Sequence, residues 1–195
     1  MGTRLDAKLK LDLDRFMARL PRGDLWVFGY GSLMWSPDFR FAERRAAHLH
    51  GYHRSLCILS HSYRGTPERP GLVMGLCPGG SCWGVAFRID KGHVGRTMAK
   101  LWHREMPNNV YEARFVMVRL GRRVVRAVAF VADRRHRQFA GHLSVLQTAR
   151  MVAQGCGVRG QNLDYLAHTV SHMDELGVRE GHLHKVLTRA RKLCA

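Results

Sequence analysis

The sequence has no long apolar stretch and no recognisable targeting segment. No run of apolar residues reaches the roughly 18 that a membrane-spanning helix needs, and the N-terminus lacks the pattern of a signal peptide. The 195 residues are 46% hydrophobic and 24% charged, which is typical of a globular protein, and this length is most simply one domain. We therefore expect a cytoplasmic protein without a membrane partner.

Paired cysteines and metal-binding motifs are also missing. The five cysteines are odd in number and scattered, which favours free thiols in a reducing compartment. Cys77 and Cys82 lack a second pair and a histidine at a zinc-like spacing. His168 and His172 stand one helical turn apart, but no further ligand is near them in the sequence, so a solvated helix face is favoured over a metal site. The sequence predicts no metal.

Acidic residues are few. The chain has 15 Asp and Glu against 32 Lys and Arg, a formal charge of +17, which invites the hypothesis of a nucleic-acid or polyanion binder. The basic residues are nevertheless spread along the whole chain, with no basic–aromatic RNA motif and no helix-turn-helix spacing. We expect a diffuse basic surface that favours anionic small molecules, and no specific nucleic-acid partner.

A glycine-rich turn at residues 29–32 is the first candidate for a ligand site. An apolar run at 25–28 enters Gly29-Tyr30-Gly31-Ser32, where the two glycines allow conformations that a Cβ forbids. Such a turn exposes backbone N–H groups that suit a carboxylate, a phosphate or a developing oxyanion. It is neither a dinucleotide fingerprint nor a nucleophile elbow, so Ser32 is a poor nucleophile candidate. The alternative is a plain tight turn.

The order of the expected elements indicates an α+β domain. Residues 4–20 predict a charged helix that ends at Pro21 and packs on the outside of the domain, so we assign 1–22 to a helical leader and 23–195 to a single domain. Expected strands cover 25–29, 45–60, 72–76, 82–89, 113–120 and 124–131, and expected helices cover 94–106, 144–155, 162–177 and 180–193. Strands first and helices last favour a mostly antiparallel sheet or barrel.

Three turn and cap assignments accompany these elements. Pro78-Gly79-Gly80 is expected to join two separate strands, and Gly121-Arg122 to form the turn of a hairpin. Ser144 and Asn162 are expected to cap the helices that they begin.

Glu105 is a carboxylate on the apolar face of the expected helix at 94–106. It lies three residues beyond Trp102, four beyond Leu101 and seven beyond Met98, so these side chains share one face. Burial among them raises the pKa of a carboxyl group and lets it take and give a proton near neutral pH. Helical phase leaves an alternative equally open, in which Glu105 pairs with Arg104 or bends out to water.

A series of motifs runs in order through residues 25–180. It contains WVFGYGSLMW at 26–35, GYHR at 51–54, RGTPERPGL at 64–72, CWGVAFR at 82–88, REM at 104–106, AFVAD at 129–133 and DYL at 164–166. Together these motifs resemble the ChaC family of glutathione-specific γ-glutamylcyclotransferases. The resemblance implies a small, mostly antiparallel β-barrel with flanking helices. It also implies cleavage of glutathione to 5-oxoproline and cysteinylglycine, without water and without a cofactor.

The resemblance assigns site residues as well. It makes Glu105 the catalytic glutamate that acts as general base and then general acid. It makes Val27, Phe28, Gly29, Tyr30, Gly31 and Ser32 the substrate-binding turn, which Leu33 completes, and it places Tyr111 in the pocket wall. One departure is Asn109, where family members usually carry glycine; asparagine tolerates positive φ nearly as well, so we expect a small effect.

Two other functions remain as alternatives. The same chemistry serves a cyclotransferase for other γ-glutamyl amino acids or amines, a choice that the loop at 61–71 and the residues after Glu105 would set. A non-enzymatic polyanion-binding protein is favoured only by the charge of +17. Such a binder does not need Glu105 on an apolar face.

Overall fold

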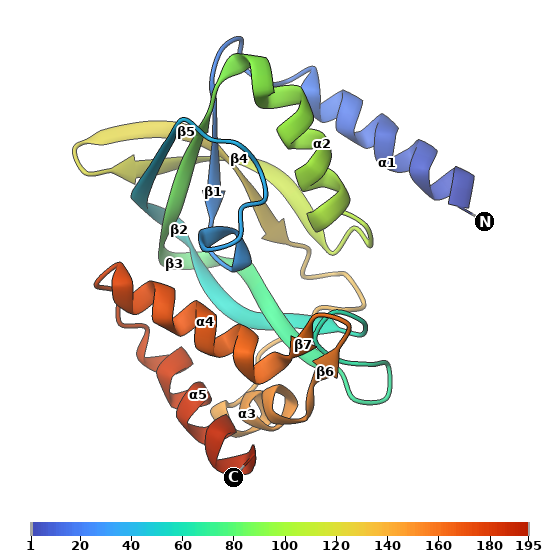
Figure 1. The fold of residues 1–195 in the computed structure, drawn as a ribbon, viewed down its shortest axis with the longest axis vertical. Coiled ribbons are helices and arrows are strands. Elements are labelled where there is room, and N and C mark those ends of the chain that lie inside the picture. Colours follow the sequence, from blue (N-terminus) through green and yellow to red (C-terminus); the bar gives the residue numbers. More distant parts are fainter. Residues whose placement is uncertain (1, 195) are drawn as a thin grey trace.

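The computed structural model describes residues 2–194, and a closed barrel of five strands forms its centre (Figure 1). Around the barrel the order is β1 (Leu25–Gly29), β3 (Gly71–Ile89), β2 (Glu43–Ser60), β4 (Tyr111–Leu120) and β5 (Arg123–Ala132). Neighbouring strands are antiparallel except β1 and β5, which pair in parallel and close the barrel. The predicted α+β fold with a small, mostly antiparallel barrel is confirmed.

The two longest strands bend together. The prediction of two strands joined by Pro78-Gly79-Gly80 is wrong, because β3 runs without a break through this segment. Gly79 and Gly80 both have positive φ, as does Gly51 on the partner strand β2, and the pairing register shifts between them. Glycines at these positions build a bulge that bends both strands, which a barrel needs in order to close.

One helix, α2 (Val94–Glu105), covers one side of the barrel, and α1 (Gly2–Met17) packs against it (Figure 1). α2 follows β3 through the short 3-10 helix η2 (Lys91–His93), and α1 lies along the outer side of α2. α1 is attached by Phe16, which is buried and packs its ring against Trp102 of α2 and Phe115 of β4. The predicted leader helix is therefore present, and its last turns contribute to the core.

The C-terminal third forms a helical layer at the other end of the barrel. It contains α3 (Val145–Gln154), the short strands β6 (Cys156–Gly157) and β7 (Gly160–Gln161), α4 (Asn162–Glu175) and α5 (Gly181–Cys194). Ser144 caps α3 in a capping box, as predicted. The prediction that Asn162 caps α4 is wrong: Gln161 is the N-cap residue. The Asn162 side chain is instead bonded to both backbone groups of Leu72 in β3.

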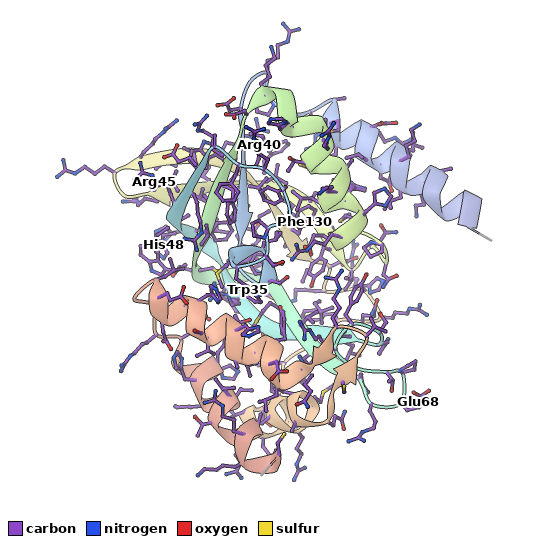
Figure 2. The ribbon with its side chains drawn as sticks, in the orientation of Figure 1. Trp35, Arg40, Arg45, His48, Glu68 and Phe130 are labelled. Carbon is purple, nitrogen blue, oxygen red and sulfur yellow. The ribbon has the colours of Figure 1, made fainter. Side chains whose placement is uncertain are left out.

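The core lies inside the barrel and continues to the surrounding helices. Phe28, Phe87 and Phe130 are among its fully buried side chains. Figure 2 shows Phe130 within the barrel, whereas Arg45 on β2 points out into solvent. Within residues 2–194, no helix is long and apolar enough to cross a membrane.

Candidate active site

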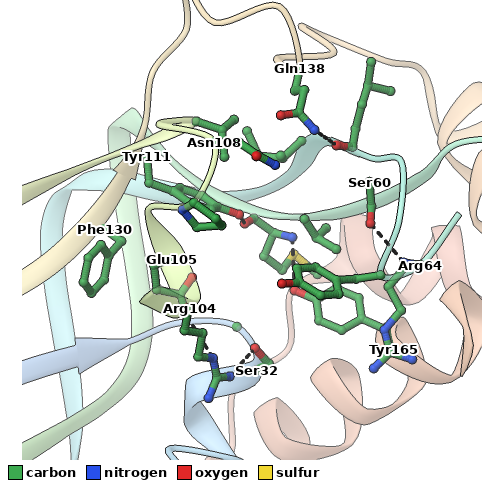
Figure 3. Close-up of a pocket in the computed structure, with 18 of the residues that line it drawn as sticks. Ser32, Ser60, Arg64, Arg104, Glu105, Asn108, Tyr111, Phe130, Gln138 and Tyr165 are labelled. Carbon is green, nitrogen blue, oxygen red and sulfur yellow. Dashed lines mark hydrogen bonds and ion pairs between the residues drawn. The ribbon is translucent and has the colours of Figure 1, made fainter. Parts of the chain in front are cut away.

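A pocket opens where the end of β1, the C-terminal end of α2 and the β6–β7 turn meet above the barrel (Figure 3). Tyr30, Ser32, Glu105, Tyr111 and Tyr165 all line it. These residues come from the first, second and last thirds of the chain. The fold therefore brings the predicted turn and the predicted carboxylate to one cavity.

The turn after β1 forms one wall of the pocket. Tyr30, Gly31, Ser32 and Leu33 line it, but Val27, Phe28 and Gly29 do not, because they belong to β1 and are buried below. Neither Gly29 nor Gly31 adopts a positive φ. Gly29 is required for space instead: a Cβ there would lie 2.8 Å from Cβ of Leu33, where the chain folds back into the 3-10 helix η1 (Ser32–Met34).

Backbone N–H groups of this turn are available to a ligand. Within the described residues, the N–H groups of Gly31, Ser32 and Leu33 donate to no backbone or side-chain acceptor. The hydroxyl of Ser32 accepts a hydrogen bond from Nη2 of Arg104 at 2.8 Å. The turn therefore lines the cavity with backbone N–H groups that have no acceptor in the described residues, and its role as an anion site stays a prediction.

Glu105 ends α2 with its side chain at the pocket. Its carboxylate lies 3.1 Å from Nε of Arg104, and only 18% of each side chain is exposed. Burial raises the pKa of Glu105, and the charges of Arg104 and Arg159 oppose that rise in part. Both readings from helical phase hold: Glu105 is desolvated, as its apolar neighbours predict, and it is also paired with Arg104.

Three buried tyrosines surround the carboxylate. The hydroxyl of Tyr30 donates to the carbonyl of Phe130 at 2.6 Å, and that of Tyr111 donates to the carbonyl of Met74 at 2.8 Å. The hydroxyl of Tyr165 instead accepts from the N–H of Met74 at 3.1 Å. Burial raises the pKa of all three, to about 12 for Tyr165, so they are protonated at neutral pH. The proton of Tyr165 remains available for a ligand.

The last wall was predicted from the sequence only in part. Arg64 lines the pocket and belongs to the loop at 61–71, to which the choice of substrate was assigned, whereas Arg159, in the β6–β7 turn, also lines it and was not predicted. The β6–β7 turn packs directly on that loop, because a Cβ at Gly157 would collide with the Ser62 carbonyl. Arginines are frequent in this sequence, and only the packing of two segments almost 100 residues apart singles out these two.

The loop between Glu105 and Tyr111 has the conformation that its sequence predicted. Asn109 adopts a φ of +54°, in the left-handed region where glycine is otherwise favoured. The His168–His172 pair serves packing: His172 stacks on Trp35 with ring centroids 5.2 Å apart. Among the side chains of residues 7–194, no three His, Cys, Asp or Glu gather at a spacing that would hold a metal.

Sequence comparisons point to one family. Residues 25–193 match the family model described as "ChaC-like protein". A "Glutathione-specific gamma-glutamylcyclotransferase" of Escherichia coli (strain K12) is 33% identical over 178 residues, which cover 91% of this chain and 77% of that protein. A Homo sapiens protein named "Glutathione-specific gamma-glutamylcyclotransferase 1" is 30% identical over 170 residues, covering 82% of this chain and 77% of that one.

A structural comparison agrees on the fold. A crystal structure described as a γ-glutamyl cyclotransferase specific to glutathione from yeast superposes with a TM-score of 0.81. The superposition covers 87% of this chain and 96% of the yeast chain at 23% sequence identity. The barrel and its flanking helices are therefore shared between the two.

Proposed function

Because the chain belongs to the ChaC-like protein family, we propose that it cleaves glutathione by cyclising the γ-glutamyl group, which releases 5-oxoproline and cysteinylglycine. The names of the Escherichia coli and human relatives support this substrate. One observation from the structure carries the chemistry: a desolvated carboxylate, Glu105, and a turn of free backbone donors line the same pocket.

The proposed reaction balances without a redox partner or water. The α-amine nitrogen of the γ-glutamyl group attacks its own δ-carbonyl carbon, so a ring C–N bond forms. The bond to the cysteine nitrogen then breaks. One proton leaves the attacking amine and one joins the departing nitrogen. A single group can move both protons in turn if its pKa lies nearer to neutrality than that of an ordinary carboxylate.

Glu105 is the residue that we assign to both proton transfers. Burial raises its pKa, and the bond to Arg104 at 3.1 Å holds the carboxylate in one orientation. Arg104 is fixed in turn by Ser32 at 2.8 Å and by the carbonyl of Ser36 at 2.5 Å. This chain of contacts links the proton carrier directly to the turn that is proposed to hold the substrate.

The turn and Tyr165 supply the donors that we assign to substrate binding. The N–H groups of Gly31, Ser32 and Leu33 and the hydroxyl of Tyr165 suit either the α-carboxylate or the tetrahedral oxyanion. Tyr165 lies close to the turn, since a Cβ at Gly31 would be 3.3 Å from its hydroxyl. The attack is intramolecular, so a pocket that holds the substrate folded supplies much of the acceleration through proximity.

The decisive experiment measures products. Purified protein is incubated in parallel with glutathione, γ-Glu-Ala and γ-Glu-ε-Lys, and 5-oxoproline and the released amine are quantified by mass spectrometry. We expect 5-oxoproline and cysteinylglycine from glutathione. Release of 5-oxoproline only from the other two compounds contradicts the glutathione assignment, and release from none contradicts the cyclotransferase.

The Glu105→Gln variant tests the mechanism. We expect the rate on glutathione to fall by about 10²- to 10⁴-fold, the usual contribution of a general acid–base group, with an unchanged circular dichroism spectrum. Glu175→Gln, an exposed position at the end of α4, is the matched control and should retain full activity. Activity retained by Glu105→Gln contradicts the role of this residue.

A further inference from the structure

Two arginines in the pocket have no acidic partner. Arg104, the third arginine of the lining, is committed to Glu105. Among the side chains that the structure describes, those of residues 7–194, no carboxylate lies within 4.0 Å of the guanidinium of Arg64 or Arg159. Two neighbouring positive groups without a counter-charge favour an anion between them.

Both guanidinium groups are held in place by aromatic rings. The guanidinium of Arg159 lies over the ring of Tyr63 at 4.7 Å, and the backbone N–H of Arg159 donates to the Tyr63 carbonyl at 3.0 Å. Arg64 lies over the ring of Tyr165 at 5.4 Å and donates from Nη1 to the carbonyl of Gln161 at 3.1 Å. Stacking restricts the side chains while most of their N–H donors stay free. Such preorganised guanidinium groups are suited to bind a carboxylate.

The two groups influence each other and the catalytic carboxylate. Burial lowers the pKa of Arg64, and the nearby charge of Arg159 adds to this effect, while Tyr165 and Asp164 oppose it. The charge of Arg159 also lowers the pKa of Glu105, although the two do not form an ion pair. Arg159 is therefore within electrostatic reach of the reacting end of the pocket but does not contact it.

Glutathione has two carboxylates, and they lie at different distances from the scissile bond. The α-carboxylate shares a carbon with the attacking amine and must stay beside Glu105 and the turn at residues 30–33. The glycine carboxylate lies two residues beyond the scissile bond, at most about 7 Å away in an extended chain. Figure 3 shows Arg64 beside Tyr165, across the cavity from Glu105. The unpaired Arg64 therefore lies on the side of the cavity away from Glu105, where a carboxylate distant from the scissile bond would lie.

We propose that Arg159, assisted by Arg64, binds the glycine carboxylate of glutathione and selects γ-glutamyl peptides that carry a carboxylate at that distance. This inference rests on the proposed function, because it takes glutathione as the ligand. Arg159 is a specificity-determining residue, distinct from the groups that move protons. It explains how a pocket built for the γ-glutamyl group distinguishes a tripeptide from a γ-glutamyl amine.

The test removes the charge from each partner in turn. The variants are Arg159→Met, which keeps the aliphatic stem, Arg159→Lys, which keeps the charge, and Arg189→Met, an exposed control on α5. The substrates are glutathione and its glycine ethyl ester. We expect Arg159→Met to raise KM for glutathione by about 10- to 100-fold, the value of a charged hydrogen bond, with kcat little changed.

For the ester, Arg159→Met should leave KM at the wild-type value, because the ester lacks the charge that Arg159 is proposed to bind; the change in the pKa of Glu105 that follows loss of the Arg159 charge is common to both substrates. Arg159→Lys should recover part of the glutathione affinity, and Arg189→Met should change neither substrate. An equal rise in KM for both substrates would place Arg159 at the α-carboxylate and overturn the inference. An unchanged KM for glutathione would also overturn it.

A binding measurement separates this inference from the proposed function. Calorimetric titration with glutathione and with the ester uses the Glu105→Gln protein, with and without Arg159→Met, so that no substrate is consumed. A preference for glutathione that Arg159→Met abolishes supports the carboxylate site even if wild-type protein forms no 5-oxoproline, a result that would refute the proposed reaction alone. No preference for glutathione over the ester overturns the site.

Discussion

Two largely buried Arg–Glu pairs contact the turn after β1, and they serve different purposes. Arg104 and Glu105 lie 3.1 Å apart at the pocket, and Arg54 and Glu180 lie 2.6 Å apart between the barrel and the C-terminal helices. Burial raises the pKa of both glutamates, and the paired arginine opposes the rise in each. By charge, distance and pKa direction, the two pairs look alike.

Their surroundings distinguish them. The guanidinium of Arg54 is fully buried and also donates to the carbonyls of Tyr30 and Trp83, so it ties the end of β1, β3 and the segment before α5 together. Glu105 instead faces a cavity beside free donors. A perturbed carboxyl pKa is therefore a weak sign of catalysis by itself, and access to a cavity is the property that separates the two sites.

The largest expected effect is that one pair affects stability and the other affects activity. Arg54→Met should lower the free energy of unfolding by about 3 kcal/mol, because it breaks a buried pair and removes hydrogen bonds to two carbonyls. Glu105→Gln should remove activity yet leave the free energy of unfolding unchanged or slightly higher. Urea denaturation measures the free energy of unfolding of both variants, and the 5-oxoproline assay measures their activity. A large loss of stability in Glu105→Gln, with activity retained, would invert our assignment of the pairs.

Two asparagines are expected to differ in their contribution to stability. One is bonded to β3 and the other lies on the loop after Glu105. Asn162 is fully buried and bonds the Leu72 N–H at 2.6 Å and carbonyl at 2.7 Å. Asn162→Ala leaves both groups unpaired, so we expect a loss of about 3 kcal/mol. Asn109 is exposed and has a φ of +54°, so Asn109→Ala should cost about 1 kcal/mol and Asn109→Gly should cost nothing. Equal losses of unfolding free energy in Asn162→Ala and Asn109→Ala, measured by urea denaturation, would contradict this difference.

The smallest expected effect is a shift in pH dependence. A base must be ionised to act, so kcat/KM on glutathione should fall at low pH with an apparent pKa above the ordinary glutamate value of about 4.3. Arg104 lowers the pKa of Glu105, so in Arg104→Gln the fall of kcat/KM at low pH, the acid limb of the profile, should move to higher pH. Arg189→Met should leave the profile in place. A limb at or below the ordinary value would contradict desolvation of Glu105.

Stability should respond to pH through the same residue. The raised pKa means that the folded state binds more protons than the unfolded state between the ordinary and the raised values. Unfolding free energy therefore falls as pH rises through this window, and the contribution is fully present only below it. Glu105→Gln should lack this component, so its stability relative to wild type should increase as pH rises through that window.

Local sequence patterns predicted the elements that depend on neighbours along the chain. The face that Glu105 occupies follows from its spacing to Trp102 and Leu101, and the hairpin at Gly121-Arg122 follows from turn chemistry. Asn109 adopts the backbone conformation that its residue type allows. In each case, the physical cause lies within a few residues of the effect.

The errors arise where the cause lies in a distant partner. Pro78-Gly79-Gly80 reads as a turn, and only its pairing with the bend at Gly51 makes it a bulge. Asn162 reads as a cap because its strand partner, Leu72, is 90 residues away. Arg159 was missed for the same reason, since the contact between the β6–β7 turn and the predicted loop at 61–71 brings it to the pocket.

The backbone of Met74 holds two of the three pocket tyrosines, because its carbonyl accepts from Tyr111 and its N–H donates to Tyr165. Every residue type except proline offers the same two atoms. Alanine scanning at position 74 would therefore report only the packing of the thioether and would miss this role. An insertion or deletion that shifted β3 by one residue would displace both hydroxyls at once. The pocket therefore depends more on the number of residues in β3 than on the residue type at position 74.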